Sequence, residues 1–293
     1  MQLRAFAKIN LGLDVIRKRE DGYHEVRMIM QTIQMYDLLK MDKQKDQKVQ
    51  GIHLTTNLPY VPCDERNLVY KAAKMLMDEF HIDQGLTMDL RKFIPVSAGM
   101  AGGSSDAAAA MVGVNRLFGL KLTAKQLMKR GVSIGADVPY CIMRGTALAE
   151  GIGEILTPLL PIPSCYILIG KPGVNVSTKI AYDNLNLREI KCHPQIDHLM
   201  EAIKAGDLKS MAGFMENVFE PGMIREYPII EKIKNLMLEQ GALNSLMSGS
   251  GPTVFGVFDN RQKLEKAALC LRDSHLAKTV FATKVFNVGR KNK

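Results

Sequence analysis

The sequence is poor in the features that mark nucleic-acid-binding, membrane and secreted proteins. Tryptophan is absent, and aromatic residues make up only 6% of the 293 residues, which leaves few rings for stacking on single-stranded nucleic acid. No apolar run reaches the roughly 18 residues of a transmembrane helix. The first residues, Met1 to Lys8, carry charges where a signal peptide would be apolar. We therefore expect a cytoplasmic protein without a membrane partner.

Cysteine is also scarce and irregularly placed. The chain has Cys63, Cys141, Cys165, Cys192 and Cys270. Their spacing matches neither a zinc site nor a disulfide framework, which indicates a reducing compartment. The net charge of +9 suits either nucleic acid or a small anionic substrate. Because Lys and Arg are spread along the chain, we rank an anionic metabolite first and keep a basic nucleic-acid-binding protein as the alternative.

One stretch of small residues is the strongest signal for function. It reads Pro95, Val96, Ser97, Ala98, Gly99, Met100, Ala101, Gly102, Gly103, Ser104 and Ser105. An alanine-rich segment with helical spacing follows it. Glycines let backbone amides approach an anion closely, and the first turn of a helix offers unpaired N–H groups and partial positive charge. The stretch is therefore a candidate phosphate site, although an ordinary turn with Ser104 as helix N-cap is an equally good interpretation.

The remaining pattern predicts mixed secondary structure. Alternating apolar residues from Leu3 to Val15 predict a strand, on which Lys8 and Asn10 share one face; that face could also simply meet water. Asn67 can cap a helix over 68–80, and residues 86–93 form a short strand before the small-residue stretch. Helices and strands mix without a regular βαβ order, which indicates an α+β protein. The length and three prolines within 158–163 suggest two domains.

Four motifs in this order resemble those of the GHMP kinases, a family of ATP-dependent small-molecule kinases. They are the strand with Lys8 and Asn10, the stretch 95–105, the segment 135–139 and the segment 248–253. The resemblance implies an ATP-binding N-terminal domain over residues 1–157, with the fold of the second domain of a ribosomal protein. It also implies a ferredoxin-like C-terminal domain over residues 158–293.

The segments 7–11, 21–24, 102–107 and 135–139 narrow the resemblance to one branch. That branch phosphorylates the 2-hydroxyl of a cytidine-diphosphate-linked methylerythritol in non-mevalonate isoprenoid biosynthesis. Compared with the common family loop, Met100 replaces Leu and Ala101 replaces Gly, and an extra Gly-Gly precedes the serines. Ala98 and Ala101 stand where glycine is usual, so we expect the backbone at both to avoid positive φ. The alternative of a mevalonate or homoserine kinase of the same family stays open.

The resemblance also implies roles for individual residues. Asp137 would be the general base, with Lys8 beside it and Asn10 positioning the hydroxyl. Ser104, Ser105 and the neighbouring amides would grip the phosphates of ATP, which Mg²⁺ bridges; no protein ligand of the metal is assigned beyond Ser105 as a candidate. Asp137 could equally be only the N-cap of the helix that begins at Val138.

The same resemblance implies where the two nucleotide bases bind. Tyr23, His24 and Tyr182 would hold the cytosine ring, and Asn67 would lie near adenine. The plainer interpretations are an exposed turn for Tyr23 and His24, a packed helix residue for Tyr182 and the N-cap role for Asn67. The expected partner is a small molecule, and we expect a monomer or weak homodimer.

Overall fold

The computed structural model describes residues 1–44, 50–183, 185, 187, 190 and 192–288. The chain forms two compact units that are interleaved in sequence. The first contains Met1–Ala7, Met35–Val96 and Ala101–Met143, and the second contains Lys8–Gln34, Ser97–Met100 and Arg144–Lys293. Strands β1 (Gln2–Lys18) and β2 (His24–Lys43) each begin in one unit and end in the other. The domain boundary expected between residues 157 and 158 stays a prediction.

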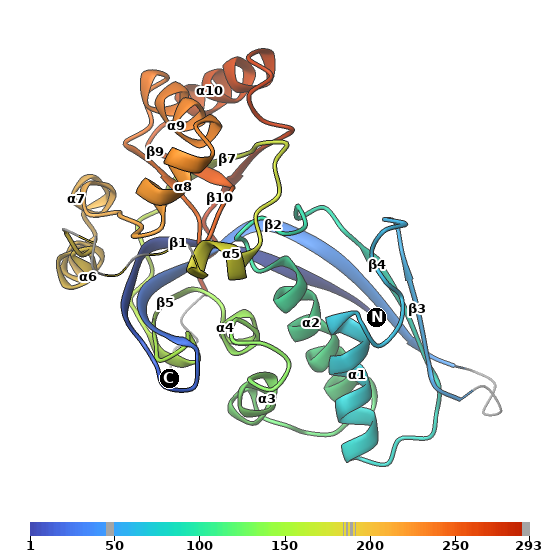
Figure 1. Ribbon diagram of the computed structural model, residues 1–293. Helices are drawn as coiled ribbons and strands as arrows, with labels where there is room; N and C mark the ends of the chain where they lie inside the picture. The colour runs from blue at the N-terminus through green and yellow to red at the C-terminus, as the bar shows by residue number, and fades with distance from the viewer. Residues whose placement is uncertain (45–49, 184, 186, 188–189, 191, 289–293) are drawn as a thin grey trace. The chain divides into compact units, whose positions relative to one another are not determined.

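The first unit packs helices and strands around a pair of alanine-rich helices. Small buried side chains such as Ala72, Ala73 and Ala108 let α1 and α2 lie side by side (Figure 1). β4 runs parallel to β3 and antiparallel to β2, with Leu38 of β2 opposite Arg91 of β4. The elements that lie wholly in this unit are β3 (Ile52–Thr56), α1 (Leu68–Glu79), β4 (Leu86–Arg91), α2 (Gly102–Leu117), α3 (Ala124–Gly131) and α4 (Val138–Met143).

The strands of the second unit are β5 (Thr146–Glu150), β6 (Ile155–Pro158), β7 (Tyr166–Lys171), β8 (Asn244–Met247), β9 (Val254–Phe258) and β10 (Thr279–Lys284). β5 pairs with β2 and β6, and an antiparallel sheet in the order β10-β7-β9-β8 packs against α9 and α10 (Figure 1). The helices are α5 (Thr178–Asp183), α6 (Ile196–Ala205), α7 (Leu208–Gly213), α8 (Glu220–Glu226), α9 (Ile229–Glu239) and α10 (Arg261–Asp273).

Strand β1 is more deeply buried than its alternating sequence suggests. From Ala7 to Val15 the side chains of both faces are buried. At Gly12 a Cβ would lie 2.8 Å from Ile196 and 2.9 Å from Leu199, so helix α6 packs directly on the strand backbone. On the same strand, Lys8 and Asn10 are 5% and 0% exposed. The interpretation that they simply face water is wrong.

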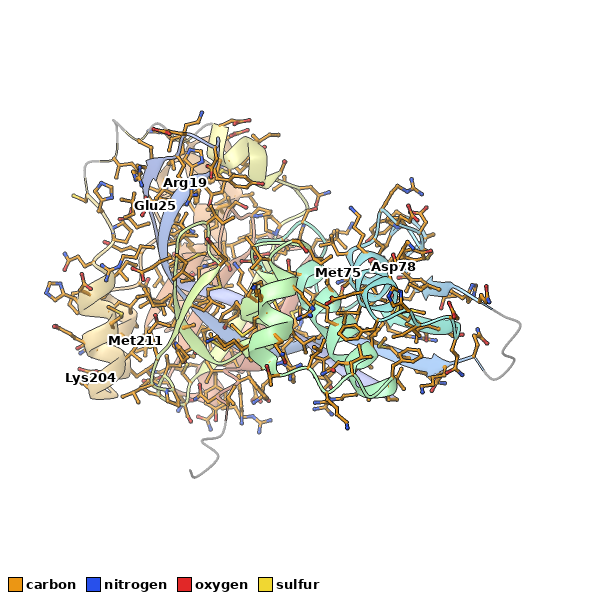
Figure 2. All side chains as sticks on the ribbon, turned by 90° about the horizontal axis from the view of Figure 1, so that it is seen from below. Arg19, Glu25, Met75, Asp78, Lys204 and Met211 are labelled. Carbon is orange, nitrogen blue, oxygen red and sulfur yellow. The ribbon has the colours of Figure 1, made fainter. Side chains whose placement is uncertain are left out.

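In the first unit, the solvent-exposed face of α1 carries charged side chains. Figure 2 shows Met75 and Asp78 on this helix, and Asp78 pairs with Lys74 at 3.0 Å.

Among the described residues, no helix combines the length and apolarity needed to cross a bilayer. The same part of the chain contains no group of three or more His, Cys, Asp or Glu side chains arranged for a metal ion.

Candidate active site

The small-residue stretch adopts an unusual backbone conformation between β4 and α2. Ser97, Gly99 and Ala101 have φ values of 52°, 70° and 54°. The expectation that Ala101 avoids positive φ is wrong: it is the N-cap of α2 in the left-handed conformation and makes no side-chain capping bond. A left-handed alanine costs about 1 kcal/mol, and the chain adopts this conformation where it turns into the helix. Ala98 is not among the residues with positive φ, as expected.

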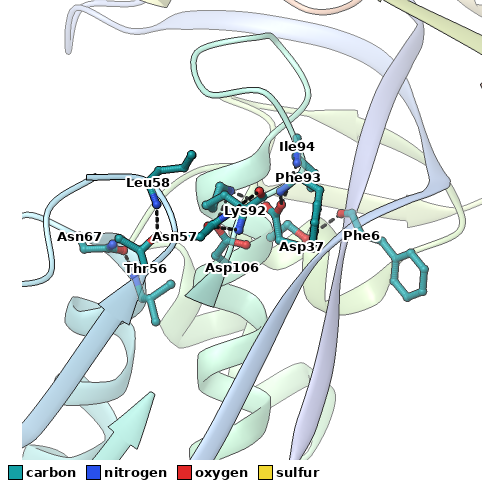
Figure 3. Close-up of polar contacts among 12 residues, drawn as sticks. Phe6, Asp37, Thr56, Asn57, Leu58, Asn67, Lys92, Phe93, Ile94 and Asp106 are labelled. Atoms are coloured by element: carbon teal, nitrogen blue, oxygen red, sulfur yellow. Dashed lines mark hydrogen bonds and ion pairs between the residues drawn. The ribbon is translucent and has the colours of Figure 1, made fainter. Parts of the chain in front are cut away.

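Helix α2 begins at Gly102, so the interpretation of Ser104 as its N-cap is wrong. Gly102, Gly103 and Ser104 occupy the first turn, where N–H groups have no partner within the helix. Ser105 is buried and its Oγ donates a hydrogen bond to the Phe6 carbonyl oxygen at 2.6 Å (Figure 3). Ser104 is only half-buried. The N-terminal end of α2 therefore presents backbone amides and the Ser104 hydroxyl. The hydrogen bond from Ser105 to Phe6 links the helix to β1.

The segment that carries Asp137 lies beside this helix end, within the first unit. A Cβ on Gly135 would lie 3.8 Å from Ser104 Oγ. Asp137 is half-buried and directly precedes α4, and its carbonyl oxygen accepts a bond from the Cys141 N–H at 3.0 Å. That position is the one expected of an N-cap. It also places Asp137 at the start of a helix, two residues after Gly135, whose Cβ position lies near the Ser104 hydroxyl.

In the second unit, Lys8 and Asn10 point to the same side of β1 and touch each other. The Lys8 ammonium donates to Asn10 Oδ1 at 2.7 Å, and the Asn10 amide contacts Met28 Sδ at 3.1 Å. The Lys8 N–H donates to the Met100 carbonyl oxygen at 3.2 Å. The strand that bears Lys8 is thus bonded to residue 100 of the small-residue stretch.

Residues 248–251 brace the same stretch from another direction within the second unit. Ser248 Oγ donates to the Gly99 carbonyl oxygen at 3.0 Å. A Cβ on Gly249 would lie 3.1 Å from the Gly99 oxygen and 3.4 Å from Asn10 Oδ1. The buried Asn217 amide holds this turn by donating to the carbonyl oxygens of Met247 and Gly249 at 2.7 and 2.8 Å. The turn at 248–251 therefore has a clear supporting role.

The residues expected at the cytosine ring lie together in the second unit. The His24 and Tyr182 rings are 4.8 Å apart, and Tyr182 packs edge-on against Phe219 at 4.7 Å. Tyr23 beside them is 60% exposed. Burial and the charge of Lys18 lower the pKa of His24, against the smaller opposing effect of Asp183. Tyr182 is thus packed in part, as the plainer interpretation expected, and Tyr23 is the freely exposed ring.

Asn67 is committed to the backbone around the start of α1. Its Oδ1 accepts from the Val69 N–H at 2.9 Å and its Nδ2 donates to the Pro62 carbonyl oxygen at 2.7 Å. This geometry is an N-cap, as the sequence predicted. These two bonds fix the orientation of the Asn67 side chain at the start of α1, and one N–H and one lone pair of its amide are left for other partners.

A buried charged cluster escaped the sequence analysis altogether. Lys92, at the end of β4, donates to Asp37 on β2 and to Asp106 on α2 (Figure 3). Burial raises the pKa of Asp106 well above its ordinary range; Lys92 opposes this rise and Asp37 adds to it. Burial lowers the pKa of Lys92, but the two carboxylates outweigh it and leave that pKa raised. The only sequence signal was an aspartate inside the apolar run of β2.

Comparisons with known proteins identify the family. The models of the GHMP kinases N-terminal domain and C-terminal domain match residues 67–145 and 199–277. A protein of Lachnospira eligens named 4-diphosphocytidyl-2-C-methyl-D-erythritol kinase is 53% identical over 98% of both chains.

Solved structures agree with this assignment. The chain resembles a crystal structure of 4-(cytidine 5'-diphospho)-2C-methyl-D-erythritol kinase with a TM-score of 0.84 and 29% identity, covering 99% of this chain and 100% of that one. A mevalonate kinase of L. major, solved with R-mevalonate, shares the fold at 19% identity and a TM-score of 0.76, covering 99% and 97%. The two-domain α+β fold is thereby confirmed, and this chain belongs to the GHMP kinases, which are ATP-dependent small-molecule kinases.

Proposed function

We propose that the protein transfers the terminal phosphoryl group of ATP to the 2-hydroxyl of 4-diphosphocytidyl-2-C-methyl-D-erythritol, a step of non-mevalonate isoprenoid biosynthesis. The structural observation that carries the proposal is the start of α2, where the Ser104 hydroxyl and amides that have no partner inside the helix lie beside the segment of Asp137. The substrate follows from the relative that is 53% identical over nearly the full chain.

The chemistry assigns a different task to each group. Phosphoryl transfer needs a base for the hydroxyl, alignment of the reactants and neutralisation of charge on the transferring group. Asp137 accepts the proton of the substrate hydroxyl, Lys8 stabilises the developing negative charge and Asn10 positions the hydroxyl. Lys8 belongs to the second unit and Asp137 to the first, so their cooperation is a prediction from the family.

Residues 95–105 bind the nucleotide phosphates through backbone amides and the Ser104 hydroxyl. Mg²⁺ neutralises phosphate charge when bound, and hydroxyl oxygens suit this hard cation. The Ser105 hydroxyl donates its hydrogen bond to the Phe6 carbonyl oxygen, which leaves lone pairs on the Ser105 oxygen as a candidate ligand. Tyr23, His24 and Tyr182 recognise the cytosine ring by stacking and hydrogen bonding. We place adenine near the start of α1, where Asn67 lies.

The proposal is tested by coupling ADP release to a spectroscopic assay with the diphosphocytidyl substrate. Wild-type protein should turn over, and Asp137→Asn should lower kcat by about 10²–10⁴. Asp78→Asn on the exposed face of α1 (Figure 2) serves as the matched control. Turnover of mevalonate or homoserine instead, or full activity of Asp137→Asn, would reject the proposal.

Cooperation of Lys8 with Asp137 is tested by a double-mutant cycle. If both act on one step, Lys8→Met combined with Asp137→Asn should lose less activity than the product of the single losses. Independent losses would contradict their pairing.

The remaining proposals concern the setting of the enzyme. We propose a cytoplasmic monomer or weak homodimer that acts on a small molecule and does not bind nucleic acid. Light scattering at several concentrations measures the oligomeric state. A salt-sensitive affinity for RNA without kinase activity would favour the nucleic-acid-binding alternative instead.

A further inference from the structure

Three charged side chains meet inside the first unit at the foot of the small-residue stretch. Lys92 Nζ donates to Asp106 Oδ2 at 2.6 Å and also to Asp37 Oδ2. All three side chains are at least nine-tenths buried. Buried ion pairs are weak evidence for stability, since desolvation offsets their attraction. Their position relative to the stretch 95–105 is more informative.

Asp37 anchors the entrance of the stretch. Its Oδ1 accepts hydrogen bonds from the N–H groups of Phe93 and Ile94, the latter at 2.8 Å. These residues immediately precede Pro95. The backbone of Lys92 is held as well, because Asn57 Oδ1 accepts from its N–H at 2.8 Å and Asn57 Nδ2 donates to its carbonyl oxygen at 3.2 Å (Figure 3). The chain therefore leaves β4 in one fixed direction.

Lys92 anchors the exit of the stretch. Asp106 lies in α2, just after the helix end that bears Ser104 and Ser105. A Cβ on Gly102 would lie only 3.2 Å from Lys92 Nζ, so the ammonium sits directly under the first residue of the helix. One side chain thus connects the anchor of the entrance, Asp37, with the helix at the exit.

We propose that Lys92, Asp37 and Asp106 form a clamp that fixes both ends of the stretch 95–105 and so positions its amides for a bound nucleotide; this rests on the proposed function. The clamp residues do not touch the nucleotide and act as positioning residues. Pre-ordering a loop lowers the entropic cost of binding. Loss of the clamp should therefore weaken nucleotide affinity even in a well-folded protein.

The three charged groups of the clamp can sum to zero charge, which suits a permanent structural link. With a proton on Asp106 the three groups sum to zero charge, and the raised pKa of Asp106 favours that form. Asp106 Oδ1 is buried and has no hydrogen-bond partner. An asparagine at this position keeps an oxygen for Lys92, so Asp106→Asn should preserve the clamp.

The test separates loop positioning from overall stability. Lys92→Met removes the cation that faces Asp37, leaves that buried carboxylate charge uncompensated and should destabilise the protein. The neutral triple variant Lys92→Met, Asp37→Asn, Asp106→Asn removes every charge, while the side-chain oxygen at position 37 can still accept from the N–H groups of residues 93 and 94. We expect it to regain thermal stability over Lys92→Met without regaining the link from position 37 to α2. Lys74→Met, on the exposed face of α1, is the matched control.

Two measurements decide the outcome. Amide hydrogen exchange in residues 97–105 should be at least about tenfold faster in the triple variant than in wild type, with α3 unchanged. The Kd for ADP, measured by calorimetry, should rise about tenfold, whereas Asp106→Asn and Lys74→Met should match wild type. Wild-type exchange in residues 97–105 of a folded triple variant would overturn the clamp. Neither measurement uses the acceptor substrate, so failure of the proposed reaction would be recognised separately.

Discussion

The backbone of Gly99 lies against that of Ser248 so closely that a Cβ on Gly99 would be 2.2 Å from the Ser248 carbonyl oxygen. Ser248 Oγ also donates to the Gly99 carbonyl oxygen at 3.0 Å. Two segments about 150 residues apart are thus fitted together without room for a methyl group. The relationship shows why this stretch needs glycine at position 99.

Gly99→Ala should therefore disrupt the stretch. The clash with backbone and the left-handed φ of 70° should lower the free energy of unfolding by about 2 kcal/mol or more, and the KM for ATP should rise at least about tenfold. Urea unfolding and steady-state kinetics measure both effects. Gly119 is also at positive φ but has open space around it. Gly119→Ala therefore measures the cost of a left-handed alanine without a clash. Equal losses in the two variants would show that packing against Ser248 is unimportant.

The two serines at the head of α2 should differ in their contribution to stability. Ser105→Ala removes the bond to Phe6 and should cost about 1 kcal/mol of stability. Ser104→Ala removes an accessible hydroxyl and should raise the KM for ATP about tenfold, because bonds to charged phosphate are stronger than neutral ones, with an unchanged Tm. Thermal melts and ATP titrations of both variants test the contrast. A lowered Tm for Ser104→Ala with an unaltered KM would reverse the assignment.

Tyr23 should matter for the acceptor and not for ATP. Stacking of a base on an aromatic ring contributes about 1–3 kcal/mol, so Tyr23→Ala should raise the KM for the diphosphocytidyl substrate about tenfold or more. The KM for ATP and the Tm should stay the same, since Tyr23 is largely exposed. Leu269→Ala, an exposed apolar residue on α10, should change none of these quantities. An unchanged acceptor KM in Tyr23→Ala would place the cytosine elsewhere.

Stability should depend on pH through Asp106. Burial is the main cause that raises the pKa of Asp106 in the folded protein. The folded state therefore binds more protons than the unfolded state, in which an aspartate titrates at about 3.9. The free energy of unfolding should then fall as pH rises from that value to the folded pKa and level off above it. Asp106→Asn should flatten this fall. Urea titrations of both proteins at a series of pH values measure it, and parallel curves would contradict the prediction.

Local patterns predicted the regular elements well. Periodicity placed the strand of Lys8 and Asn10, and the capping residue Asn67 marked the start of α1. Strand β2 runs from His24 to Lys43, and Asp37 is a buried polar residue inside it. Local patterns do not show that such a residue is an anchor for another segment.

Local sequence patterns could not predict features that depend on partners far away in the chain. Lys92 lies 55 residues from Asp37 and 14 from Asp106, and no periodicity links the three. Asn10 on β1 is buried among partners that are distant in sequence, with Met28 Sδ at 3.1 Å and Gly249 close to its Oδ1. The left-handed Ala101 contradicts the ordinary preference of alanine, and it forms where the turn into α2 demands that geometry. The catalytic roles came from the family resemblance, since Asp137 alone looks like a helix cap.

Asp37 has a consequence for how the chain folds. Neighbouring side chains on a strand point to opposite faces, so a slip of β2 by one residue against β4 would carry this carboxylate away from Lys92. The slipped arrangement would leave charges stranded in an apolar interior, at a cost of several kcal/mol. The aspartate therefore favours the register seen in the structure, because any other pairing of β2 with β4 would bury its charge without Lys92.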